Sequence, residues 1–265
     1  MASVTGRIAK VKQPRGGYIN KKQLEIITFD DGQEIAPEEN IHPSLVGLAV
    51  DYLTRWRMGA EPEEAFQISR LGAACYDMYM DKGRLWKRRK AMKHAKKLLA
   101  EMQELDDRAI VSACRLVGYD VCYRAGMSAY KPVEDIDPDQ TTVDNIRTMV
   151  VRSVAFWETY GPVIKDGFTF EGGYTTVIDA GDGDYLTADT LWDFKVSKDE
   201  PTAKHTLQLL VYYIMGCHSK HREFRNIKKL GIFNPRKNKA YMIDVAALPT
   251  EVIEEVSREV IGYKR

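Results

Sequence analysis

Apolar residues recur every three or four positions between about residues 43 and 125, which is the spacing of amphipathic helices. The second of these helices opens at Pro62, since proline is favoured in the first turn. A third is predicted over about residues 84–104. A fourth starts after Asp106 or Asp107, where an acidic residue can cap it. The pattern therefore predicts a run of helices in the first half of the chain.

The segments on either side of this helical run have a different pattern. Residues 1–40 are mostly polar with short strand-like pieces, of which residues 24–29 are the clearest. Residues 131–140 contain two prolines and four acidic residues, a composition typical of a boundary between domains. We therefore expect an N-terminal, mostly helical region with short strands over residues 1–130 and a second domain over residues 141–265.

Strands and helices are mixed in the second domain. A helix capped by Thr141 or Thr142 opens it, and short apolar runs separated by turn residues follow. Strands are predicted at residues 168–170, 174–178, 185–186, 191–196, 229–233 and 241–245, the first two as partners in a hairpin, and helices at residues 203–215 and 250–261. This order predicts an α/β fold, with helices packed on a mixed sheet.

Composition narrows the class of protein. Of the 265 residues, 44% are hydrophobic and 29% charged, which is ordinary for a soluble globular protein, and the net charge of +1 means that any nucleic acid must be bound by a local patch. No stretch is apolar for long enough to span a membrane, and the N-terminus lacks the apolar core of a signal peptide. The four cysteines are scattered, which is typical of reduced thiols, so we expect a cytoplasmic protein.

Three charged residues mark the candidate chemistry of the second domain. Asp193 and Lys195 share one face of a predicted strand, because side chains alternate, while the aromatic residues between and before them point the other way. A carboxylate and an ammonium on an otherwise hydrophobic strand are costly to bury unless they are used. Asp184 precedes a predicted tight turn at residues 187–189. A hairpin there would bring its carboxylate beside that of Asp193.

Two carboxylates at the ends of adjacent strands form an oxygen site that suits Mg²⁺ or Mn²⁺. The backbone carbonyl of Phe194 is a further candidate ligand. Lys195 can hold an attacking water or counter the charge that grows on a scissile phosphate. The alternative for Asp193 and Lys195 is an ordinary exposed strand with a salt bridge on one face.

This series of residues resembles the PD-(D/E)XK nuclease superfamily. Asp184 and the tripeptide Asp193-Phe194-Lys195 match its D…(D/E)-x-K motif in order and spacing. Gln208 and Tyr212 are four residues apart on the next predicted helix, so they share one face. They match the Q-x-x-x-Y element of the RecB-like branch of that superfamily. The resemblance covers about residues 143–245.

The resemblance implies a restriction-endonuclease-like core and metal-dependent hydrolysis of DNA, in the recombination, repair or defence of bacteria or phages. It implies that Gln208 and Tyr212 orient the substrate strand. The family often adds an upstream acidic ligand, for which Glu158 is the first candidate and Glu171 the second. Gly183 stands where the family usually has proline. Relatives with an iron–sulfur cluster use four cysteines, and only one follows the core motifs here, so we expect no cluster.

Two further features have both a functional and a structural interpretation. His205, one turn before Gln208, either approaches the substrate or caps its helix. Residues 82–97 contain nine Lys or Arg and no acidic residue, which indicates either a solvated helix face or a contact with nucleic-acid phosphates. Trp86 in this segment either stacks on an unpaired base or packs into the core. The candidate phosphate contacts are Lys87, Arg88, Arg89, Lys93 and Lys97.

Three alternatives to a DNA nuclease stay open. The first is a catalytically inactive DNA-binding module on the same fold, which would bind DNA without cutting it under Mn²⁺. The second is a helical interaction protein in which the motif is a coincidence, and this alternative predicts no metal binding. The third is a nuclease directed at RNA, which a panel of substrates would identify.

Overall fold

The computed structural model describes residues 2–81 and 89–264. The chain forms two compact units. The first combines Met1–Asp30 with Phe156–Arg265 and contains the main sheet, and the second is Asp31–Ala155 and is helical. Of the helices within the described residues, none has both the length and the apolar character needed to cross a membrane.

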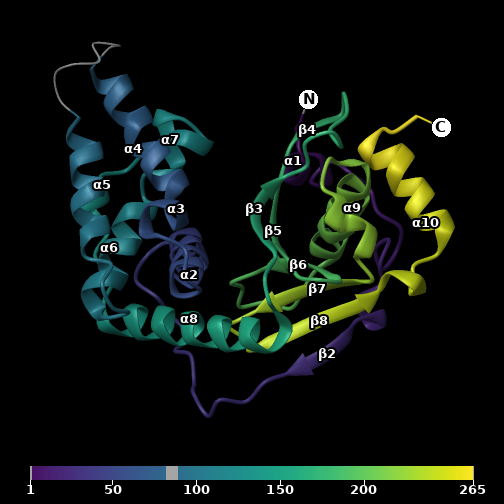
Figure 1. Ribbon diagram of the computed structural model, residues 1–265, viewed down its shortest axis with the longest axis horizontal. Coiled ribbons are helices and arrows are strands. Elements are labelled where there is room, and N and C mark those ends of the chain that lie inside the picture. Colours follow the sequence, from purple (N-terminus) through teal and green to yellow (C-terminus); the bar gives the residue numbers. More distant parts are fainter. Residues whose placement is uncertain (1, 82–88, 265) are drawn as a thin grey trace. The chain divides into compact units, whose positions relative to one another are not determined.

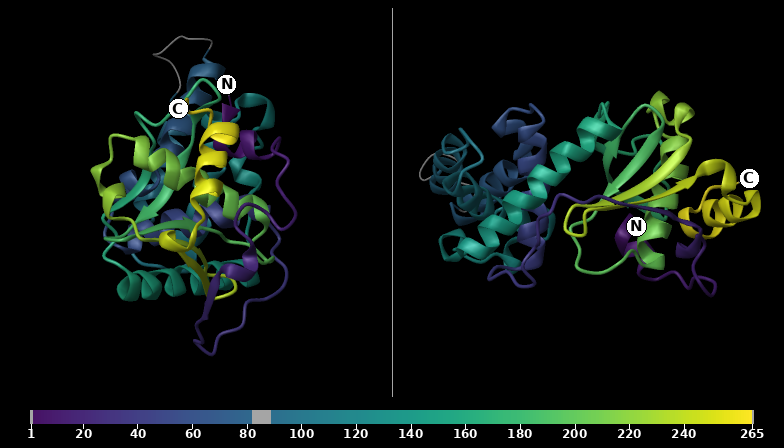
Figure 2. Two further views of the ribbon diagram at one scale, coloured as in Figure 1. Left: turned by 90° about the vertical axis from the view of Figure 1, so that its right-hand side faces the viewer. Right: turned by 90° about the horizontal axis from the view of Figure 1, so that it is seen from below.

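The division between the units differs from the one expected at residues 131–140. Strand β2 (Glu25–Thr28) pairs antiparallel with β8 (Lys239–Asp244), and the two lie side by side in Figures 1 and 2. This pairing places the N-terminal segment in the same unit as the C-terminal strands. At the other boundary, helix α8 (Gln140–Tyr160) runs without interruption across the point where one unit passes into the other.

The helical unit contains the helices expected between residues 43 and 125. Its described helices are α2 (Pro43–Arg57), α3 (Pro62–Ala65), α4 (Gln67–Met80), α5 (Lys90–Ala100), α6 (Asp107–Val117) and α7 (Asp120–Arg124). Asp106 caps α6 by accepting a hydrogen bond from the backbone N–H of Ala109 at 2.8 Å, as the sequence predicted. The helix expected over residues 84–104 is described from Lys90 to Ala100, because residues 82–88 lie outside the described residues.

The other unit is built on a mixed sheet, so the α/β class is confirmed. Within the described residues, six strands have the order β2-β8-β7-β6-β5-β3, with β6 and β7 parallel and the remaining neighbours antiparallel. Ala2–Ser3 (β1) pairs with Ile178–Ala180 (β4) in a small parallel sheet. The other strands are β3 (Lys165–Thr169), β5 (Asp182–Leu186), β6 (Thr190–Phe194) and β7 (Lys229–Asn234).

The hairpin expected between residues 168–170 and 174–178 is wrong. A turn does form at Gly172, which has a φ of 90° that glycine adopts without strain. The chain after it does not return along β3, however, because the hydroxyl of Tyr174 accepts a hydrogen bond from the N–H of Phe170 and donates one to the carbonyl of Gly181. The partner of β3 is therefore β5, and β4 pairs with the N-terminal β1.

Helices cover both faces of the sheet, and alternate side chains of β6 pack against the helix on one face or on the other. Helix α9 (Ala203–His218) packs on the face of Leu191, as seen beside the strands in Figure 1. The last turn of α8 packs on the opposite face, where the ring of Phe156 stacks on Phe233 at 3.8 Å and meets Trp192 edge-on at 5.0 Å. The aromatic layer fixes β6 on one side and leaves its other side to face α9.

The C-terminal helix closes the unit against its N-terminal residues. Helix α10 (Thr250–Glu255) continues as a π-helical segment to Ile261, close to the expected 250–261. Arg7 of α1 (Val4–Ile8) donates from Nε to the backbone carbonyl of Val260 at 2.9 Å. Both ends of the chain therefore pack on the same helix, α9, that covers the candidate site.

Candidate active site

The hairpin of β5 and β6 brings the two predicted carboxylates to one place. Tyr185 faces Trp192 and Leu186 faces Leu191, so the next step of the same register sets Asp184 opposite Asp193. At that step the side chain of Asp184 accepts the backbone N–H of Phe194 at 2.8 Å. The half-buried Asp184 carboxylate is thus tied to the backbone immediately after Asp193.

Asp193 is the most deeply buried group of the site. Its side chain is fully buried, and Oδ1 accepts a hydrogen bond from Nζ of Lys195 at 2.9 Å. Its other oxygen, Oδ2, is buried and accepts no hydrogen bond from the described part of the chain. A buried carboxylate oxygen without a partner costs free energy, because it has lost its water without replacement. Oδ2 therefore favours a ligand that offers it a hydrogen bond or a positive charge.

Helix α9 adds two polar side chains to the same face. Gln208 and Tyr212 are both buried, and Nε2 of Gln208 donates to the hydroxyl of Tyr212 at 2.9 Å. Burial raises the pKa of Tyr212, and the negative charges of Asp184 and Asp193 raise it further. The phenol is thus protonated and lies within the field of both carboxylates. Tyr212, hydrogen-bonded to Gln208, is therefore close enough to both acids for their charges to act on it.

His205 belongs to the same neighbourhood and also caps its helix. Nδ1 accepts the backbone N–H of Thr202 at 3.2 Å, which requires the neutral ring with its proton on Nε2. Burial lowers the pKa of His205, the positive charge of Lys195 lowers it further, and Asp193 acts in the opposite direction. The capping interpretation is confirmed, and the electrostatic coupling places His205 near the charged pair.

The structure does not bring the two candidate upstream acids to this cluster. Glu158 is exposed on α8, and its neighbour Trp157 packs at 4.6 Å on the ring of Tyr185, on the sheet face opposite to Asp184. Glu171 is exposed and pairs with Lys220 at 2.9 Å. Among residues 2–81 and 89–264, no three His, Cys, Asp or Glu side chains form a group that could hold a metal ion.

The donor set fits a hard divalent cation by chemistry, with two protein carboxylates. Asp184 and Asp193 supply oxygen ligands of the kind that Mg²⁺ and Mn²⁺ prefer, and the orphaned Oδ2 of Asp193 is the atom that most needs a partner. Mg²⁺ commonly keeps several waters and uses one or two carboxylates plus phosphate oxygens.

The candidate phosphate contacts lie in the helical unit. Lys87, Arg88 and Trp86 fall outside the described residues. Arg89, Lys93 and Lys97 are exposed at the start and along the length of α5. Their side chains therefore give α5 a positively charged surface within that unit.

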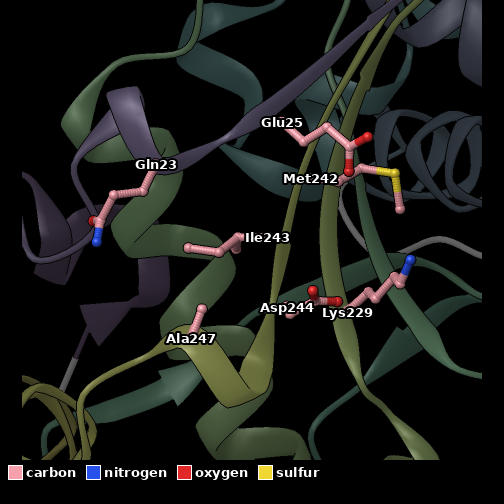
Figure 3. A pocket seen from close by; sticks show the side chains of 7 residues that line it. All are labelled: Gln23, Glu25, Lys229, Met242, Ile243, Asp244 and Ala247. Atoms are coloured by element: carbon pink, nitrogen blue, oxygen red, sulfur yellow. The ribbon is translucent and has the colours of Figure 1, made fainter.

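A small cavity of about 140 Å³ lies at a different place in the sheet unit (Figure 3). Its walls come from β2, β7, β8 and the residues that flank them, and Lys229 faces Asp244 across β7 and β8. The lining residues are Gln23, Glu25, Lys229, Met242, Ile243, Asp244 and Ala247. None of the predicted site residues is among them, so this cavity is separate from the carboxylate cluster.

Replacing Asp184 tests whether its carboxylate holds the end of β6. In Asp184→Ala the N–H of Phe194 loses its acceptor, and an unsatisfied buried donor costs about 1–3 kcal/mol. Asp184→Asn keeps an acceptor oxygen, so we expect a clearly smaller loss in the free energy of unfolding. Urea denaturation in EDTA measures the free energy of unfolding of the wild type and of both variants. Equal losses in the two variants would show that the bond to Phe194 contributes nothing.

The neutral state of His205 predicts a pH dependence of stability. Because its pKa is lower in the folded than in the unfolded chain, its contribution is complete above the unfolded value of about 6.5 and is lost as pH falls through the folded value. His205→Gln keeps an acceptor for the cap and does not titrate. We expect the wild type to lose more stability than this variant between about pH 7.5 and about pH 5. Parallel curves for the two proteins would contradict the assignment.

The comparisons with known proteins give no relative on which to base a function. No model of a protein family, no curated protein and no solved structure matches the chain. The interpretation of the site therefore depends on the geometry of Asp184, Asp193, Lys195, Gln208 and Tyr212.

Proposed function

We propose that this chain is a metal-dependent nuclease that hydrolyses phosphodiester bonds of DNA on a restriction-endonuclease-like core. One observation carries the proposal. A fully buried carboxylate, Asp193, is held by Lys195 through one oxygen and leaves the other without a hydrogen bond, next to a second carboxylate on the facing strand. A structural salt bridge needs only one acidic partner for its lysine. Here two acids lie together, and one carboxylate oxygen of Asp193 still lacks a hydrogen bond.

Asp184 and Asp193 are the residues that would hold Mg²⁺ or Mn²⁺, with the backbone carbonyl of Phe194 as a candidate third ligand. When bound, such an ion lowers the pKa of its water and offsets negative charge on a phosphate. Two hydrogen bonds hold the backbone and side chain that would support it. Asp184 is fixed by the N–H of Phe194, and the backbone of Lys195 is fixed by the carbonyl of Phe233 at 2.9 Å.

Lys195 provides the positive charge of the site. Its ammonium group lies 2.9 Å from Asp193, and its side chain is 26% exposed, so it is reachable by a substrate from the surface. An ammonium at this position can hold the attacking water or stabilise the charge that develops on the phosphate oxygens. Removing one such donor from an active site reduces the rate by about 10²–10³-fold.

Gln208 and Tyr212 are suited to positioning the phosphate. In their mutual hydrogen bond the tyrosine hydroxyl is the acceptor, so its own proton can be donated to an anionic ligand. The raised pKa of Tyr212 keeps that proton in place. A neutral donor next to two carboxylates accommodates a phosphate better than a phenolate would, because it adds no negative charge.

A second candidate is a module that binds DNA without cutting it. One observation favours it, since the part of the chain described here has no group of three metal-ligating side chains and Glu158 lies on the other face of the sheet. The nuclease cuts the DNA that it binds, whereas the binding module does not. Both proposed functions use the same residues to contact the nucleic acid.

Cleavage assays with linear, circular and single-stranded DNA and with RNA test the proposal. We expect cleavage of DNA in Mn²⁺ or Mg²⁺ and none in EDTA, with Lys195→Ala slower by about 10²–10³-fold. Lys228→Ala removes an exposed lysine of the same unit and serves as the matched control. Binding without cleavage under every metal would select the second candidate, and cutting of RNA alone would replace DNA as the substrate. Cleavage that persists in EDTA, or that proceeds at the wild-type rate in Lys195→Ala, would overturn the assigned site.

Titration of Mn²⁺ into the protein gives a readout that is separate from activity. We expect Asp193→Asn to lose measurable Mn²⁺ binding, because the orphaned oxygen is replaced by an uncharged group and the ion is left with one carboxylate. Asp199→Asn, which changes an exposed carboxylate after the same strand, should bind as the wild type does. Identical isotherms for the wild type and Asp193→Asn would exclude this metal site.

A further inference from the structure

The helical unit contains a second candidate binding site, which the nuclease proposal does not use. A cavity of about 180 Å³ lies between the end of α4, the first turns of α5 and the segment that follows α7. Its lining combines three tyrosines with a lysine, a histidine and a glutamate. The lining residues are Tyr76, Lys90, Ala91, His94, Tyr119, Tyr130, Pro132 and Glu134.

The three tyrosine rings form the walls of this cavity, which we name the tyrosine pocket. Tyr130 lies 4.6 Å from Tyr76 between ring centroids and 6.2 Å from Tyr119, whose ring is nearly parallel to it. Tyr119 is buried, whereas Tyr76 and Tyr130 are half-buried and offer ring surface to a ligand. Rings presented in this way are stacking platforms for flat aromatic groups.

The polar groups of the pocket lie beside these rings. Nδ1 of His94 lies 3.1 Å from the hydroxyl of Tyr119 and 3.8 Å from a carboxylate oxygen of Glu134. Burial raises the pKa of Tyr119, and it raises that of Tyr130 to about 12, so both hydroxyls stay protonated and uncharged. Glu134 offers an acceptor for an exocyclic amino group, such as that of cytosine.

One of the basic side chains of α5, Lys90, lines the pocket, and others are exposed on the same helix. The side chains exposed at the start and along α5 are Arg89, Lys90, Lys93, Lys96 and Lys97. The backbone N–H groups at the start of α5 are not available to an anion, because those of Ala91 and Met92 donate to the carboxylate of Asp77. An anion at this end of α5 must therefore be met by lysine side chains, of which Lys90 lines the pocket itself.

We propose that the tyrosine pocket binds one unpaired nucleobase, stacked on Tyr130 with the tilted ring of Tyr76 at its edge, while Lys90 contacts the adjacent phosphate. A flat aromatic group joined to an anion is the ligand that matches both the rings and the charge. The volume supports a single ring system, since pockets for drug-sized ligands span about 300–1,000 Å³. The inference concerns the helical unit alone and does not depend on cleavage by the other unit.

The test measures binding of a short, fluorescently labelled oligodeoxycytidine in EDTA, so that no cleavage interferes. Tyr130→Leu removes a stacking ring, and we expect about a fivefold or greater loss of affinity, the lower end of what one stacked base contributes. Tyr130→Phe keeps the ring and should bind within about twofold of the wild type. Tyr123→Leu removes an exposed ring of the same unit that does not line the pocket, and should bind as the wild type does.

An abasic strand of the same length shows whether the base is what the ring recognises. The wild type should bind the abasic strand more weakly than the base-bearing strand. Tyr130→Leu should cause no further loss of affinity for the abasic strand, because the ring contributes only when the base is present. Lys90→Ala should weaken the binding of both strands alike and reduce the number of counterions released on binding by about one. Competition by deoxycytidine monophosphate would show that a free nucleotide is also accepted, and its absence would restrict the pocket to bases in a strand.

Two results would overturn the proposal. One is equal weakening of the abasic and the base-bearing strand by Tyr130→Leu, and the other is no weakening of either. A readout on the wild type guards against a variant that fails to fold. A strand carrying 2-aminopurine should lose fluorescence on binding as that base stacks, and unchanged fluorescence on a bound strand would also exclude the pocket.

Discussion

The burial of the Asp193 carboxylate is the constraint from which the arrangement of the sheet unit follows. A charged group in the interior must be compensated, and here one oxygen is met by Lys195 while the other is not met by the described residues. The aromatic layer of Phe156, Trp192 and Phe233 packs on the opposite face of the strand, and the carboxylate is fully buried on its own face. The packing on the other face contributes stability that can offset the cost of this unsatisfied group.

The residues around Asp193 lie on regular strands and a helix, the elements on which a proposed site for a metal and a phosphate is held most precisely. Both acids lie on strands in the interior of the sheet, and the glutamine and tyrosine lie on the helix that covers them. The helical unit contributes a different kind of surface, made of lysines and tyrosine rings. The proposed roles of the two units are therefore complementary, one reacting with the phosphodiester and the other binding a base and its phosphate.

Local sequence patterns were sufficient for the features that depend on neighbours along the chain. Alternation placed Asp193 and Lys195 on one face, a short turn placed Asp184 opposite, and a four-residue spacing joined Gln208 to Tyr212. Pairings between distant segments had no such signal. The partner of β3, the attachment of β2 to β8 and the place of Glu158 depend on the whole sheet, and the tyrosine pocket combines three separate segments.

The pairing of β2 with β8 has a consequence for the order of folding. Glu25 lies opposite Met242, so the sheet unit is interrupted in sequence by the entire helical unit. During synthesis the helical unit emerges complete while β2 still lacks its partner, and contacts between segments so far apart in sequence form slowly. A ribosome-bound chain that stops short of β8 would carry an unpaired strand beside a finished helical unit. β2 is thus held in the sheet only once β8, more than two hundred residues later in the chain, has been made.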